Sequence, residues 1–84
     1  MMLTVQLFAR ARDLAGADAL AVVLPTGATV GELRTAISQI CPALRDLLPR
    51  CAIAVDEDFA GDDRSLFMNA EVAVIPPVSG GSSQ

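Results

Sequence analysis

Two adjacent glycines, Gly80 and Gly81, follow a pair of prolines near the end of the sequence. Glycine has no side chain, so this backbone can thread a narrow channel and bring a carboxyl group of Gly81 close to a reactive centre. Pro76 and Pro77 favour a stiff polyproline conformation, in which residues 76–81 reach about 20 Å at roughly 3.1–3.3 Å per residue. Glycine and serine near a terminus usually indicate a disordered end. The preceding "IPPV" instead favours an arm that enters another protein.

Few side chains in the sequence are suited to catalysis. Histidine, lysine, tyrosine and tryptophan are absent, which removes the usual general bases and the residue that forms Schiff bases. No serine or cysteine has a histidine to activate it, and no glycine-rich phosphate loop leads from a strand into a helix. We therefore expect that the chain is not an enzyme by itself and that its chemistry takes place at the tail.

The acidic segment "DEDFAGDDR" is the strongest candidate for a metal site. Asp56, Asp58 and Gly61 have the spacing of the first two ligands and the glycine of a calcium-binding loop. Ala60 and Phe67 stand where two further ligands are required, so the pattern is incomplete. The sequence predicts a solvated turn here and no metal site.

Composition favours a small domain that binds a partner. The 84 residues form one domain near the size at which a single core is barely sufficient. Residues are 52% hydrophobic, but no apolar run approaches the roughly 18 residues of a membrane span, and no basic segment leads into a signal peptide. A cytoplasmic protein is expected. The net charge of −4 argues against nucleic acid and anionic membranes; it serves solubility or suits a basic protein partner.

The two cysteines are interpreted as structural. Cys41 and Cys51 are too few and too far apart for a zinc knuckle or a redox pair. Both lie among apolar residues, so we expect two buried free thiols in a reducing compartment.

The elements that position the tail are visible as patterns of hydrophobicity. Residues 3–8 alternate and predict a half-buried strand, in which Phe8 is an aromatic on the polar side that lies under a neighbouring segment or meets a partner. A turn or short helix ending at Gly16 leads to a second strand over residues 18–24. Further strands are predicted over residues 51–55 and 71–75.

One main helix is predicted between the second and third strands. Thr29 and Glu32 have the spacing of a capping box that begins a helix, and Pro42 ends it. A single apolar stripe, suited to packing across a sheet, is formed by Val30, Leu33, Ile37 and Ile40.

The order strand, strand, helix, strand, strand predicts an α+β roll with one helix across a mixed sheet. A right-handed crossover allows the first and last strands to pair in the centre, so that the tail projects from the middle of the sheet. We expect a domain over residues 1–76 and a flexible tail over residues 77–84.

Three stretches carry a resemblance to a known family. The segments "LFARARDLAG", "TVGELRTAI" and above all "VAVIPPVSGG" resemble the small subunits of molybdopterin synthase, which are ubiquitin-like sulfur carriers of the β-grasp fold. The resemblance runs in register over residues 3–81. It implies a heteromeric complex with the large synthase subunit.

The resemblance also implies a reaction cycle and a set of site residues. An activating enzyme uses ATP to adenylate the C-terminal glycine, and sulfur replaces AMP to give a thiocarboxylate. The tail then enters the large subunit and gives its sulfur to cyclic pyranopterin monophosphate, and the carrier itself binds no cofactor. Gly81 is the implied reacting residue and Gly80 its slim neighbour. The implied guides of the arm are Pro76, Pro77 and Val78, and the candidates for an apolar docking face are Phe8 and Ile75.

One departure from the family concerns the residues after Gly81. Members that act directly end at the second glycine, whereas Ser82–Gln84 follow it here. Gly81 therefore carries an amide in place of the required carboxylate. Either a protease removes "SSQ", or the tail is inert, or adenylation takes place at Gln84, which fits a narrow channel poorly. Alternatives to the synthase subunit are a protein modifier, a non-catalytic interaction module and a sulfur carrier of another pathway.

Overall fold

The computed structural model describes residues 1–77 and contains one mixed sheet with the order β2-β1-β5-β3-β4. Its helices are α1 (Ala9–Ala15) and α2 (Val30–Ile40), followed by the 3-10 turns η1 (Pro42–Leu44) and η2 (Leu48–Arg50). Its strands are β1 (Met2–Leu7), β2 (Ala19–Val23), β3 (Ala52–Val55), β4 (Asp58–Ala60) and β5 (Val72–Ile75). Within the described residues, no helix has both the length and the apolar character to cross a membrane.

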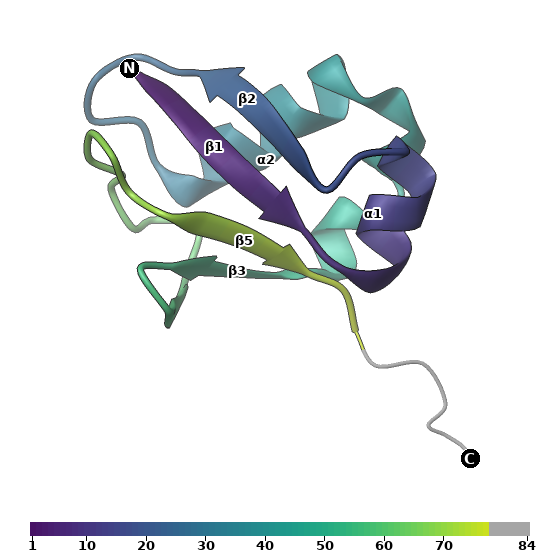
Figure 1. Cartoon of the computed structure of the whole chain (residues 1–84). Coiled ribbons are helices and arrows are strands. Elements are labelled where there is room, and N and C mark those ends of the chain that lie inside the picture. The colour runs from purple at the N-terminus through teal and green to yellow at the C-terminus, as the bar shows by residue number, and fades with distance from the viewer. Residues whose placement is uncertain (78–84) are drawn as a thin grey trace.

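The first and last strands pair in the centre of the sheet, as expected. β1 and β5 are parallel, with Val5 opposite Val72 and Leu7 opposite Val74. β2 and β3 flank them in antiparallel pairing. Figure 1 shows β1 and β5 side by side, with α2 behind the sheet and the end of β5 near α1. This arrangement is the predicted β-grasp roll, and the chain leaves the sheet from a central strand.

The core lies between the sheet and α2. Alternate residues of β1 point into it, and α2 buries Val30, Leu33 and Ile37 completely. Ile40 was expected in the same stripe, but this was wrong because its side chain is 51% exposed. The helix ends at Ile40, and the fully buried Leu44 of η1 packs in the core after the chain turns.

The connection between β1 and β2 is a helix. The sequence predicted either a turn or a short helix here, and the structure has the short helix α1, which buries Ala11 against the core. Gly16 ends it in a left-handed conformation, with φ of 70°, and its N–H donates to the carbonyl of Arg12 at 2.9 Å. A residue without Cβ is favoured at such a helix end.

The acidic segment contains a strand that was not predicted. β4 pairs antiparallel with β3, so the expected order of four strands gains a fifth. The segment is mostly exposed, as expected for a solvated turn, but its residues 58–60 form a strand. Asp56 and Glu57 form the tight turn between β3 and β4, with φ of 51° and 73°. Hairpins of this kind usually show Asn-Gly or Asp-Gly at these positions, and this turn has neither.

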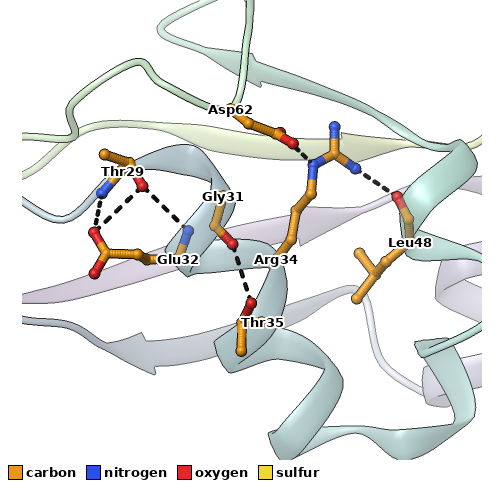
Figure 2. A network of polar contacts seen from close by, with 7 residues as sticks. All are labelled: Thr29, Gly31, Glu32, Arg34, Thr35, Leu48 and Asp62. Carbon is orange, nitrogen blue, oxygen red and sulfur yellow. Dashed lines mark hydrogen bonds and ion pairs between the residues drawn. The ribbon is translucent and has the colours of Figure 1, made fainter.

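The capping box at the start of α2 is present (Figure 2). The N–H of Thr29 donates to the Glu32 carboxylate at 2.9 Å, and the N–H of Glu32 donates to Oγ1 of Thr29 at 3.3 Å. Further along α2, Arg34 donates to Asp62 at 2.8 Å and to the carbonyl of Leu48. These contacts join the helix to the loop after β4 and to η2.

The cap should contribute measurably to stability. Thr29→Ala removes the capping oxygen and is expected to lower the free energy of unfolding by about 1 kcal/mol. The matched control is Thr35→Ala, because the hydroxyl of Thr35 donates only to the carbonyl of Gly31 within α2. Urea unfolding of both variants measures the difference. An equal loss of stability in the two variants would contradict a specific role of the cap.

Candidate docking surface and tail base

The face of the sheet opposite α2 carries an apolar surface. Cross-strand neighbours place Ala73 of β5 beside Ala54 of β3, and Ala54 beside Phe59 of β4. Ile75 lies two residues beyond Ala73 on the same side of β5. We call the surface formed by Phe8, Ala54, Phe59, Ala73 and Ile75 the sheet face. Its residues line a cavity of about 460 Å³.

Phe8 and Ile75, the two predicted docking residues, lie together on the sheet face. Phe8 follows β1 in an extended conformation, with φ of −122° and ψ of 154°, and its side chain is 45% exposed. Ile75 ends β5 and is half-buried. Both residues line the 460 Å³ cavity and also a second cavity of about 740 Å³ at the base of the tail. The structure thus brings them together, while their role in docking stays a prediction.

Phe59 is the large residue of the sheet face that the sequence analysis missed, together with the small residues Ala54 and Ala73. Its side chain is 75% exposed, and it faces outward because β4 is a strand, which the sequence did not reveal. The signal was the short alternation in "DFA" after two acidic residues, which is weak beside the turn signals around it. A phenylalanine this exposed beside other apolar side chains is typical of a protein contact surface.

The tail begins at the edge of this surface. Pro76 is buried and Pro77 is exposed, and both line the 740 Å³ cavity together with Arg10 of α1 and Arg50 of η2. The buried Pro76 holds the start of the arm against the domain. The other predicted site residues, Val78, Gly80, Gly81 and Ser82–Gln84, lie outside the described residues.

The cysteines are free, and only one of them is fully buried. The thiol of Cys51 contacts the carbonyl of Leu47 at 3.3 Å, and burial raises the pKa of this thiol. Cys41, at the end of α2, is only partly buried, so the expectation of two buried thiols was correct for Cys51 alone. In residues 1–77, no three histidine, cysteine or acidic residues are grouped so that they could hold a metal ion.

The sequence is similar to relatives with a named function. A protein of Arabidopsis thaliana named molybdopterin synthase sulfur carrier subunit is 34% identical over 77 residues, which are 92% of this chain and 80% of that protein.

Solved structures show the same fold. The crystal structure of SAMP1 from Haloferax volcanii has a TM-score of 0.89 and 26% identity, and the likeness covers 96% of this chain and all of that one. A complex of subunits 1 and 2 of the molybdopterin-converting factor from Helicobacter pylori has a TM-score of 0.68 and 26% identity over 96% of this chain and 100% of the matched chain.

A comparison with family models gives a match that includes the sheet face, the tail base and the second glycine. The matched segment begins within β1 and ends at residue 81. The sequence matches the ThiS family over residues 5–81, and the chain belongs to this family.

Proposed function

We propose that this chain is the sulfur carrier subunit of a molybdopterin synthase and delivers sulfur to cyclic pyranopterin monophosphate. The observation that carries the proposal is the family match, which extends through the glycine pair, together with a relative of that name that is 34% identical over 92% of the chain. The buried Pro76 at the end of a central strand gives the arm a fixed origin.

The reaction requires a free carboxylate at Gly81. A carboxylate oxygen attacks the α-phosphorus of ATP on an activating enzyme, and pyrophosphate leaves. Sulfide then attacks the carbonyl carbon of the adenylate, AMP leaves with the electron pair of the broken carbon–oxygen bond, and a thiocarboxylate remains. Its sulfur is a better nucleophile than a carboxylate oxygen: it forms a bond to a carbon of the pterin precursor, and the carbon–oxygen bond there breaks so that the oxygen leaves with its electron pair and takes up a proton. Hydrolysis of the acyl–sulfur bond returns the carboxylate.

This chemistry asks little of the carrier's side chains. The activating enzyme and the large subunit supply the catalytic groups, and the carrier supplies a slim terminus and a surface that aims it. The absence of histidine and lysine is compatible with that division. Gly81 is the reacting residue, Gly80 keeps the terminus narrow, and Pro76, Pro77 and Val78 guide the arm.

The proposed partners are two proteins that meet the carrier in turn. The sheet face, with Phe8 and Ile75, docks on the large subunit, and the Helicobacter pylori complex of two converting-factor subunits supports a pairing of this kind. The activating enzyme is the second partner and uses the ATP. The carrier itself holds neither metal nor cofactor in this proposal and works in the cytoplasm.

A protein modifier is the second candidate function. The likeness to SAMP1, a small archaeal modifier protein, favours it. That likeness has a TM-score of 0.89 and extends over almost the whole of both chains. The two functions share activation at the terminal glycine and differ in the acceptor, which is a lysine amine for a modifier and a pterin for a sulfur carrier.

The test separates the acceptors. A chain that ends at Gly81 is prepared as a C-terminal thioester and cleaved with sulfide to a thiocarboxylate, or with water to the matched carboxylate. Each form is mixed with the large synthase subunit and cyclic pyranopterin monophosphate. Molybdopterin is expected from the thiocarboxylate only. No product from either form would contradict the synthase function, and lysine-linked conjugates in the cell, seen by mass spectrometry, would support the modifier instead.

A further inference from the structure

The sheet face has a positive end and a negative end. The 740 Å³ cavity at the tail base is lined by Arg10 and Arg50, whereas the 460 Å³ cavity is lined by Glu57 and Glu71. Phe8 and Ile75 line both cavities and so lie between the charged ends. The apolar centre is therefore flanked by two pairs of charges of opposite sign.

The fold holds these charges apart along β5. Glu71 precedes the strand, and Ile75 ends it beside the tail base, so the Cα atoms of these two residues are about 13 Å apart at roughly 3.3 Å per residue. At the negative end, the N–H of Glu71 donates to the Asp56 carboxylate at 2.9 Å and the N–H of Asp56 donates to the carbonyl of Glu71 at 2.8 Å. These bonds fix the turn that carries Glu57 beside the start of β5.

The positive end is available to another molecule. Arg10 and Arg50 are exposed, and neither forms an ion pair with a residue in the described part of the chain. The ion pairs found there involve Arg12 with Asp18 and Arg34 with Asp62. In a chain of net charge −4, two arginines that form no ion pair within residues 1–77 make a distinct positive patch at the tail base.

We infer that this polarity sets the orientation in which the carrier docks. The occupant is the large synthase subunit, which presents carboxylates to Arg10 and Arg50 near the entrance for the arm and a cationic side chain to Glu57 and Glu71. Apolar contact at Phe8 and Ile75 is non-directional and permits rotation about the contact, whereas opposed charges fix the register and speed the encounter. Only one register aims the arm into the partner. The inference rests on the proposed function.

The test measures association with the purified large subunit from the same organism. The variant Arg10→Glu/Arg50→Glu is compared with Arg45→Glu/Arg64→Glu, which changes the net charge equally at two arginines that line neither cavity. At low salt the first variant is expected to associate about tenfold more slowly than the unaltered chain, and the difference should shrink as salt is added. The control should stay within about twofold.

A charge-swapped chain separates polarity from net charge. Arg10→Glu/Arg50→Glu combined with Glu57→Lys/Glu71→Lys restores the original net charge but reverses the two ends. This chain is expected to associate more slowly than Arg10→Glu/Arg50→Glu and than the control Arg45→Glu/Arg64→Glu. Its circular dichroism spectrum should be unchanged. Association at the rate of the unaltered chain would overturn the inference and leave the proposed function standing. An unaltered chain that fails to bind the large subunit at all would overturn both.

Discussion

We expect a chain that ends at Gly81 to accept AMP and then sulfur, and a chain in which Ser82 follows Gly81 to accept neither. This is the expected result with the largest effect. In the second chain the carbonyl of Gly81 is part of an amide, and no carboxylate oxygen is available there to attack ATP. The family match ends at residue 81, so Ser82–Gln84 lie beyond the part of the chain that resembles the family.

Three forms of the chain test this expectation. They end at Gly80, at Gly81 and at Gln84, and each is given to the activating enzyme with ATP and a sulfur source. Intact mass reports the thiocarboxylate, and molybdopterin formation by the large subunit reports transfer. Only the Gly81 form is expected to react above background. All three should unfold at the same urea concentration, because the core cluster ends at Val74 and a chain terminus of this composition usually contributes little to stability.

Two results would change the interpretation of the tail. Equal activity of a chain whose mass confirms that Gln84 is retained would contradict the requirement for trimming. An inactive Gly81 form that still binds the large subunit tightly would favour the interaction module, which keeps the fold and the docking surface without the chemistry. The mass of the protein isolated from its own cells shows whether a protease removes "SSQ".

Local patterns in the sequence were sufficient for most of the fold. The alternation in β1, the capping box of Thr29 and Glu32, and the prolines after β5 each act within a few residues, and the structure contains all three. The central pairing of β1 with β5 followed from the handedness of crossover connections. These features could be predicted because neighbouring residues or general rules of chain topology determine them.

The parts that were missed depend on contacts between distant segments. β4 is a strand because β3 offers it a pairing edge, and its turn contains Asp56 and Glu57 where glycine is usual. Ile40 has the helical spacing of a core residue, yet the helix ends there and Leu44 fills the core instead. The opposed charges of the sheet face arise from four separate segments, so they became visible only when the fold brought those segments together.

The aromatic side chains of the sheet face are expected to dominate binding to the large subunit. Phe8→Ala and Phe59→Ala should each weaken the complex by about 2 kcal/mol, which corresponds to roughly 30-fold in the dissociation constant. In the free chain Phe8 is 45% exposed and Phe59 is 75% exposed. Each substitution should therefore lower the free energy of unfolding by much less than the roughly 3–5 kcal/mol expected for a fully buried phenylalanine.

Phe67 provides the matched control for this prediction. It is the third phenylalanine of the chain, its side chain is 51% exposed, and it lines neither cavity of the sheet face. Phe67→Ala removes the same chemical group and should leave the dissociation constant within about twofold. Calorimetric titration of the three variants, with urea unfolding of each, separates binding from folding. A large loss of stability in Phe8→Ala or Phe59→Ala with unchanged affinity would contradict the prediction and assign that residue to the core. A docking residue contributes to the free energy of binding, whereas a core residue contributes to the free energy of unfolding of the free chain.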